Sequence, residues 1–194
     1  MAALIDRHGP CALLDPDLRR SRPASQSHFA ALARSVLYQQ LAGKAAAAIH
    51  ARFVAQVGGR VTPDAVLAAG VDGIRAAGLS GSKAATIHNL ARACAEGELN
   101  FRRLARAPDD VVVAALVALP GIGPWTAQMF CMFTLGRLDV WPVTDYGVRK
   151  GYARAYGLAD LPAPKALDAA GEVFRPYRSV AAWYLWRVLD TETL

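Results

Sequence analysis

The chain has 194 residues, of which 54% are hydrophobic and 20% are charged. This length suits one compact unit or two small lobes, and the apolar content excludes an intrinsically disordered chain. The 22 Lys and Arg residues outnumber the 16 Asp and Glu residues, so the net charge of +6 fits a polyanionic partner, the alternative being a basic protein without one.

The sequence shows no pattern typical of a membrane span, a signal peptide or a metal site. No apolar run reaches the ~18 residues that span a bilayer. The start of the chain lacks the basic and apolar regions of a signal peptide. We therefore expect a cytoplasmic, nucleoid-associated protein with no membrane contact. The three cysteines, Cys11, Cys94 and Cys131, are scattered, which predicts neither a metal site, nor a disulfide framework, nor an iron–sulfur cluster.

Apolar residues recur at helical spacing almost throughout, so the sequence predicts an all-α fold. Thr62 and Thr144 are expected to cap helices, because a threonine side chain can accept from the free N–H groups of a first turn. We expect two helical lobes with an active-site cleft between them, one of residues 28–136 and one of residues 1–27 and 137–194. Helices are expected near residues 27–40, 45–57, 63–69, 71–77, 80–97, 100–106, 109–118, 124–135, 144–157, 164–175 and 177–189.

The stretch L-P-G-I-G-P-W-T-A, residues 119–127, joins two of these helices. Gly121 and Gly123 permit a tight turn and a close approach of another chain. The helix that follows presents N–H groups without internal partners, which suit an anion such as a DNA phosphate. Gly121, Gly123 and Thr126 are therefore expected to contact DNA. The alternative is an ordinary helical hairpin with a glycine turn.

The same stretch, followed by W-P-V-T-D-Y-G-V-R-K-G, resembles the helix-hairpin-helix and Gly/Pro-loop-Asp signature of the HhH-GPD superfamily of DNA glycosylases. Residues 35–53 and 175–187 resemble its AlkA and MAG branch of 3-methyladenine DNA glycosylases, and the likeness spans roughly residues 27–190. AlkA carries a further N-terminal β-rich domain, so we expect the shorter form without it.

By this resemblance, Asp145 is the catalytic carboxylate, at the start of the helix after the Gly/Pro loop. A purine alkylated at N3 or N7 is cationic and leaves as a neutral base, so no general acid is needed. A fixed carboxylate stabilises the positive charge that moves onto the sugar. The alternative is that Asp145 is an acidic residue favoured by the positive end of the helix dipole.

Aromatic residues are expected to bind the flipped base. The indole of Trp125 stacks well on a cationic base, and the resemblance adds Trp186 and Tyr38 to the pocket. Met129 stands where the AlkA pattern has a tyrosine. Core packing is the alternative for both tryptophans, and Trp141 and Trp183 are expected in the core.

By resemblance, Gln39 or Gln40 is the wedge that enters the gap left by the flipped base, with Gln40 preferred. The alternative for both is a solvated helix end. Lys44 is expected to contact phosphate, and Ser80, Ser82 and Lys83 are weaker candidates for the same contact. No cofactor is required, although the carbonyls of Val117, Leu119 and Ile122 could hold a monovalent cation, as in related hairpins.

The predicted function is that of a monomeric, monofunctional glycosylase acting on double-stranded DNA that contains alkylated bases. Strand-cutting relatives carry a lysine after the second hairpin glycine, and here that position reads Pro124-Trp125. Two alternatives stay open. One is a non-enzymatic helix-hairpin-helix DNA-binding protein, and the other is a glycosylase of the same fold for deaminated or etheno bases.

Overall fold

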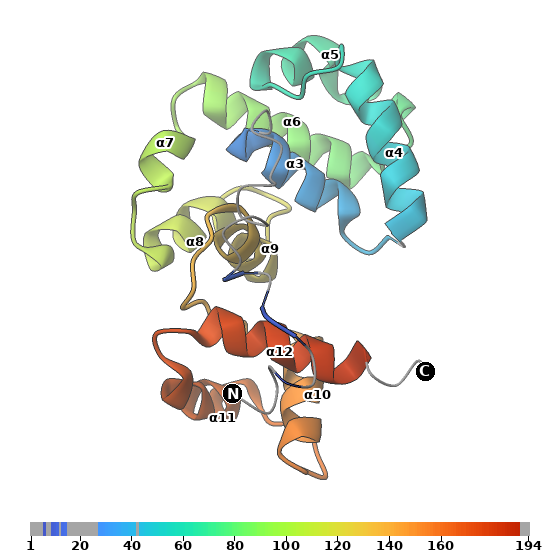
Figure 1. Cartoon of the computed structure of the whole chain (residues 1–194). Helices are drawn as coiled ribbons and strands as arrows, with labels where there is room; N and C mark the ends of the chain where they lie inside the picture. Colours follow the sequence, from blue (N-terminus) through green and yellow to red (C-terminus); the bar gives the residue numbers. More distant parts are fainter. Residues whose placement is uncertain (1–5, 7–8, 12, 15–26, 42, 191–194) are drawn as a thin grey trace. The chain divides into compact units, whose positions relative to one another are not determined.

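The computed structural model describes residues 6, 9–11, 13–14, 27–41 and 43–190. These residues form helices and loops and contain no strand, which confirms the all-α prediction (Figure 1). Most of the predicted segment 1–27 lies outside the described residues. Among the described helices, none is both long and apolar enough to cross a bilayer.

The chain divides into two compact units. The hairpin unit is Ser25–Phe130, and the aspartate unit combines Met1–Ala24 with Cys131–Leu194. The predicted division at residue 136 stays a prediction. The division seen here falls where α-helical hydrogen bonding gives way to a π-helical segment at Phe130.

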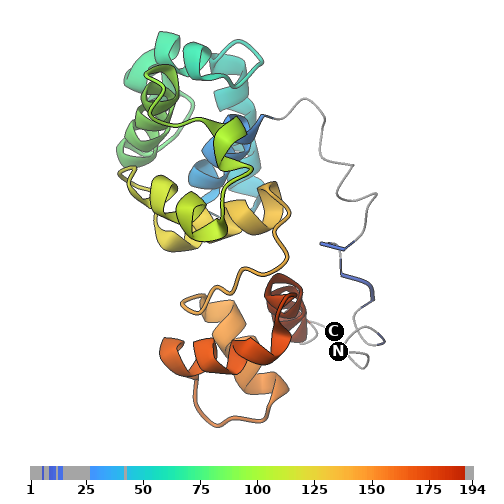
Figure 2. The same ribbon diagram turned by 90° about the vertical axis from the view of Figure 1, so that its left-hand side faces the viewer.

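The hairpin unit holds seven α-helices among its described residues (Figure 2). α5 packs along α6, and α3 contacts both α4 and α6. The side chains at its centre are large, apolar and fully buried, including Leu32, Phe53, Ile74, Ile87, Leu90 and Phe130. The helices are α3 (His28–Tyr38), α4 (Gly43–Gln56), α5 (Pro63–Ala76), α6 (Gly81–Ala95), α7 (Phe101–Leu104), α8 (Asp109–Val117) and α9 (Pro124–Met129).

Local signals in the sequence explain several helix ends in this unit. Thr62 caps α5, since its hydroxyl accepts from the N–H of Ala65 at 3.2 Å, which confirms the predicted cap. Gly70, with φ of 66°, breaks α5 into the two short pieces expected on either side of it. The predicted helix 124–135 becomes α9 followed by the π-helix η1 (Phe130–Thr134).

The predicted helical hairpin is formed by α8 and α9, which pack against each other. Its turn needs glycine at position 121 for two reasons. Gly121 has φ of 89°, which L side chains rarely adopt. A Cβ there would also lie 1.9 Å from the Thr86 hydroxyl oxygen on α6, so the hairpin turn sits directly against that helix.

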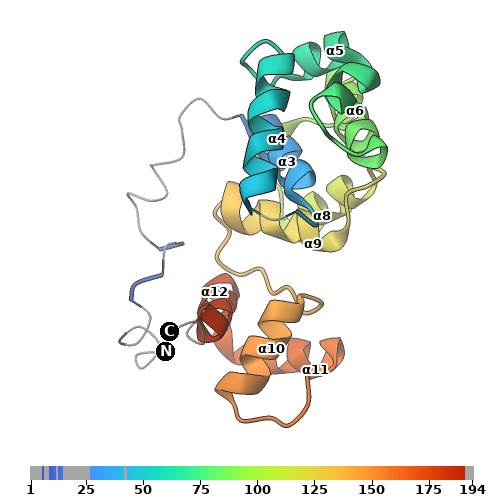
Figure 3. The ribbon, with the colours of Figure 1, turned by 90° about the vertical axis from the view of Figure 1, so that its right-hand side faces the viewer.

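The aspartate unit is built on α10 (Tyr146–Ala155) and α12 (Arg178–Asp190), with α11 (Pro164–Gly171) and the 3₁₀-helix η2 (Glu172–Phe174) between them in the chain. Figure 1 shows α12 running across α10, and Figure 3 shows the same two helices side by side. Two glycines on one face of α10 permit this crossing. A Cβ at Gly151 would lie 2.1 Å from the backbone oxygen of Leu185, and one at Gly147 would lie 2.7 Å from the ring of Trp186.

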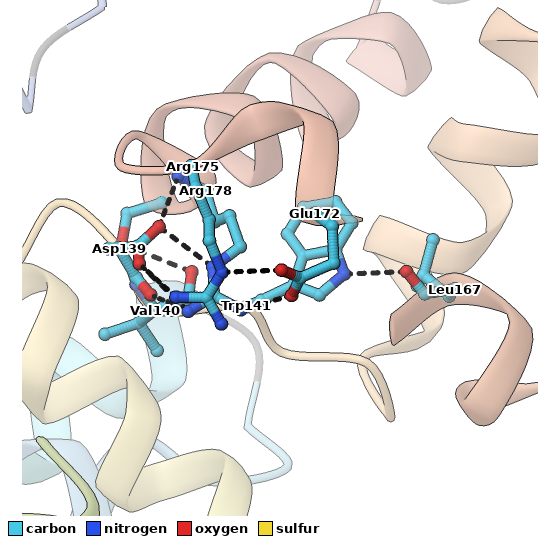
Figure 4. A network of polar contacts seen from close by, with 8 residues as sticks. Asp139, Val140, Trp141, Leu167, Glu172, Arg175 and Arg178 are labelled. Atoms are coloured by element: carbon cyan, nitrogen blue, oxygen red, sulfur yellow. Dashed lines mark hydrogen bonds and ion pairs between the residues drawn. The ribbon is translucent and has the colours of Figure 1, made fainter. Parts of the chain in front are cut away.

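The loop that leads into α10 is fastened to the start of α12 (Figure 4). The Arg178 guanidinium donates to both carboxylate oxygens of Asp139, at 2.8 and 2.9 Å, and Arg175 donates to one of them at 3.0 Å. The Ser179 hydroxyl accepts from the N–H of Val140 at 2.9 Å. Two consecutive loop residues are thereby held by two consecutive helix residues.

Trp141 continues this anchoring in the core, as predicted. It is buried, and its indole N–H donates to the Leu167 carbonyl at 2.8 Å. Trp183 is only half-buried, with the Arg187 guanidinium 4.9 Å from the centre of its ring. The core prediction is therefore wrong for Trp183, because its face of α12 is partly exposed.

The Asp139 ion pair links stability to pH. Partial burial acts to raise the pKa of Asp139, but the hydrogen bonds and charge of Arg178, with the charge of Arg175, outweigh it and hold the pKa below its ordinary value. A carboxyl whose pKa is lowered by folding adds stability at pH above its unfolded pKa. That stability is lost as the pH falls through the folded pKa.

We predict that Asp139→Asn lowers the free energy of unfolding at pH 7 by about 1.5–3 kcal/mol, the range for hydrogen bonds to charged groups. The difference in free energy of unfolding between the variant and wild type should shrink below pH ~3.9, because the Asp139 carboxyl of the unfolded wild-type chain becomes protonated there. Urea unfolding at pH 7 and pH 3 measures both values. Asp160→Asn, at an exposed position of the same unit, is the control and should cost little. An equal deficit at both pH values would contradict the ion-pair account.

Candidate active site

Asp145 stands at the N-cap of α10, with extended backbone angles of φ −67° and ψ 122°. Its Oδ1 accepts from the N–H of Val148 at 2.7 Å. The prediction that Thr144 caps this helix is therefore wrong. An aspartate is an equally good capping residue, and the anchored loop brings the chain into helical geometry one residue later.

The same carboxylate oxygen is reached by a second donor. The indole Nε1 of Trp186 on α12 lies 2.9 Å from Oδ1 of Asp145. Both side chains are half-buried. The structure thus brings together two residues separated by 41 positions, each of which the sequence assigns to the site.

Phe133 also belongs to this neighbourhood and was missed by the sequence analysis. Its ring lies 6.0 Å from that of Trp186 at an interplanar angle of 30°, and 43% of the residue is exposed. Phe133 lies within the predicted helix 124–135, where an apolar residue gives no sign of a functional role. The exposure of this large ring beside Trp186 is visible only in the folded chain.

In the hairpin unit, a cavity of about 220 Å³ brings together the other predicted base-binding residues, the two glutamines and Thr126. Trp125 is 44% exposed, and Tyr38 and Met129 are half-buried. The three therefore offer two aromatic rings and a polarisable thioether to one space. The cavity is lined by Arg34, Ser35, Tyr38, Gln39, Gln40, Trp125, Thr126 and Met129.

Arg34 is a lining residue that sequence reasoning missed. Its guanidinium lies 4.4 Å from the centre of the Tyr38 ring, four positions along the same helix. His50 packs edge-on against Tyr38, with ring centres 6.2 Å apart. Burial, and then the charge of Arg34, lower the pKa of His50. The spacing of Arg34 and Tyr38, which places both on one helical face, could have revealed the pair.

The two glutamines at the end of α3 differ in their surroundings. The Gln39 side chain donates to the Thr126 hydroxyl at 3.0 Å, which ties α3 to α9. Gln40 is exposed and has φ of 55°, the left-handed region that non-glycine residues rarely occupy. The ammonium of Lys83 donates to the carbonyl oxygens of Leu37 and Gln39, and burial lowers its pKa.

The expected phosphate contacts are spread over the hairpin unit. Gly123 is exposed and forms the N-cap of α9 without a side-chain partner. Lys44 is exposed in the first turn of α4. Thr126 is buried, and its hydroxyl accepts from Gln39. Their contacts with DNA stay predictions, and so does the cation on the hairpin carbonyls. One of these carbonyl oxygens, that of Leu119, accepts a hydrogen bond from the N–H of Ile122 at 3.1 Å.

The predicted catalytic and base-binding residues therefore form two sets. Asp145 and Trp186 meet in the aspartate unit, and the cavity residues meet in the hairpin unit. The predicted cleft between the lobes stays a prediction. Among the described residues, no group of three or more His, Cys, Asp or Glu side chains could hold a metal ion.

Comparison with known proteins places these features in a family. A profile described as HhH-GPD superfamily base excision DNA repair protein matches residues 33–176. DNA-3-methyladenine glycosylase 1 of Schizosaccharomyces pombe is 33% identical over 159 residues, which cover 80% of this chain and 70% of that protein.

Two solved structures are also similar. A DNA-3-methyladenine glycosidase from Bacillus halodurans superposes with a TM-score of 0.80 and 34% identity, over 97% of this chain and 88% of that one. The 3-methyladenine DNA glycosylase Mag1 of S. pombe, solved in complex with abasic DNA, gives a TM-score of 0.74 and 30% identity over 96% of each chain. The chain belongs to the HhH-GPD superfamily of base excision DNA repair proteins.

Proposed function

We propose that this protein is a DNA glycosylase that excises alkylated purines of the 3-methyladenine and 7-methylguanine type from double-stranded DNA. The observation that carries the proposal is the carboxylate of Asp145, held by two N–H donors at the start of α10. The names of the relatives, and the complex of one of them with abasic DNA, support it. The basic balance of the chain suits the DNA backbone.

The reaction is hydrolysis of the N-glycosidic bond. The bond between sugar C1′ and the base nitrogen breaks, and the base keeps the electron pair and leaves neutral. A water oxygen bonds to C1′, and its proton passes to solvent. Positive charge builds on the sugar in the transition state, and the negative charge of Asp145 stabilises it there. One carboxylate therefore suffices for a base that is already cationic.

The cavity of the hairpin unit is the proposed seat of the flipped base. The exposed indole of Trp125 offers a face to a cationic purine, and Tyr38 and Met129 add polarisable surface. Rotating the base out of the duplex costs a few kcal/mol, which stacking in such a cavity offsets.

We predict that Asp145→Asn slows release of methylated base by about a hundredfold to a thousandfold, because a fixed charge next to the developing cation is lost. Single-turnover assays of free base measure the rate, and filter binding to a duplex with an abasic site should show unchanged affinity. Unchanged base release would favour the alternative of a non-enzymatic DNA-binding protein.

The product is proposed to be an intact strand with an abasic site. Pro124 and Trp125 follow the second hairpin glycine, where strand-cutting relatives carry the lysine whose amine forms a Schiff base with the sugar. We predict strand breaks in a methylated duplex only after added alkali. Equal breakage with and without alkali, on denaturing gels, would show that the protein is also a lyase.

Gln40 is the proposed wedge, because Gln39 is engaged with Thr126 while Gln40 is exposed. Gln40→Gly removes the side chain and suits the left-handed backbone, so the loop should stay unstrained. We predict about tenfold slower base release from duplex DNA and an unchanged rate from single-stranded DNA, where no gap needs filling. An equal loss on both substrates would contradict the wedge role.

Arg34 favours a second candidate function. A guanidinium in the cavity repels a cationic purine but can donate to acceptor oxygens and nitrogens of a neutral base such as hypoxanthine. In this case, Arg34→Met should lose excision of the deaminated base while excision of alkylated purines persists or accelerates. Duplexes that each carry one lesion measure both.

Three finer expectations stay predictions. They are action as a monomer, a place in the cytoplasm at the nucleoid, and a monovalent cation on the hairpin carbonyls.

A further inference from the structure

We propose that Trp186 is a positioning residue that fixes the carboxylate of Asp145 through its indole N–H, and that Gly147 admits this contact. The inference rests on the proposed function, in which that carboxylate stabilises the sugar cation. It assigns Trp186 a role exerted through Asp145, distinct from that of a pocket wall.

A single hydrogen bond does not orient an aspartate. The last torsion of its side chain is broad, so one hydrogen bond, such as that from the N–H of Val148 at 2.7 Å, leaves the carboxylate some freedom to rotate about the Cβ–Cγ bond. The indole N–H of Trp186 reaches the same oxygen at 2.9 Å from another helix. Two donors from different elements restrict that rotation and set where the negative charge lies.

This contact explains why position 147 is a glycine, whereas the backbone conformation of the residue does not require one. It is the second residue of α10, and its backbone does not adopt the left-handed angles that favour glycine. A Cβ at this position would lie 2.7 and 2.9 Å from Cδ1 and Nε1 of Trp186, and 3.1 Å from Oδ1 of Asp145. A methyl group there would occupy the space in which donor and acceptor meet.

The indole is also supported from the side. Phe133 lies against it at 6.0 Å with an interplanar angle of 30°. The backbone of Leu185, next to Trp186, crosses α10 against Gly151. These contacts hold the ring so that its only polar atom, Nε1, points at the Asp145 carboxylate. A ring that served only to stack on a base would not need this orientation.

The test compares two variants that break the contact in different ways. Trp186→Phe keeps an aromatic ring and removes the donor, whereas Gly147→Ala keeps the donor and pushes it away. Trp183→Phe is the matched control, because this half-buried tryptophan of the same helix packs on Tyr184 and Arg187. Circular dichroism checks that each variant is folded. If Gly147→Ala does not fold, Trp186→Phe alone still tests the proposal.

Single-turnover rates at saturating protein should fall about tenfold to a hundredfold in both variants, since small misplacement of a catalytic group costs this much. The dissociation constant for a duplex with an abasic site should change less than about twofold, and the control should match wild type. The double variant should be no slower than the slower single variant, because both changes remove one contact.

Two further readouts separate positioning from a pocket wall. The loss should be equal for 7-methylguanine and 3-methyladenine, because the carboxylate acts on the shared sugar; a wall residue would change their ratio. In ¹H–¹⁵N spectra of the protein without DNA, the indole N–H resonance assigned through Trp186→Phe should move in Asp145→Asn and in Gly147→Ala.

Unchanged rates in both variants, additive losses in the double variant, or losses that differ between the two bases would overturn the inference while leaving the proposed function in place. Absence of base release by the unchanged protein would overturn the proposed function, and this inference with it.

Discussion

The close crossing of α10 and α12 is the constraint on which the aspartate unit depends. Helix axes normally keep side chains between them, but at Gly151 a Cβ would lie only 2.1 Å from the Leu185 backbone oxygen. This proximity sets the position of Trp186, the next residue, and so the 2.9 Å hydrogen bond to Asp145. The loop before α10 is pinned to the other end of α12 by Arg178 and Ser179, so both sides of the aspartate are held by one helix.

The hairpin unit places an exposed aromatic surface next to the turn that is predicted to bind phosphate. Gly121 lets the turn lie against Thr86, and Gln39 ties α3 to α9 through Thr126. Trp125 follows this turn in α9, and its residue is 44% exposed. Arg34 also lines this cavity. Its positive charge opposes that of an alkylated purine, so we expect this residue to affect which lesions are excised.

Most helices and the Thr62 cap could be predicted from the sequence, because apolar spacing, Thr62-Pro63 and the glycines are local signals. Asp145, Trp186, Trp125 and Tyr38 came from family motifs, and the structure sorts them into two sets. Other features depend on contacts between distant segments. The Trp186–Asp145 bond, the stacking of Phe133, the Lys83 contacts with α3 and the change from α to π at Phe130 leave no local trace. Thr144 misled because two adjacent residues could both cap α10, and only the anchored loop selects Asp145.

In the proposed reaction, Asp145 faces the sugar from which the base leaves. A crystal structure of the protein with a duplex that carries a cationic analogue of the sugar transition state tests it most directly. We expect the Asp145 carboxylate about 3–4 Å from the positive ring atom, the range of a close ion pair, with the Trp186 N–H still donating to Oδ1. An analogue bound away from Asp145, or an Asp145 side chain turned out of contact with it, would contradict the account.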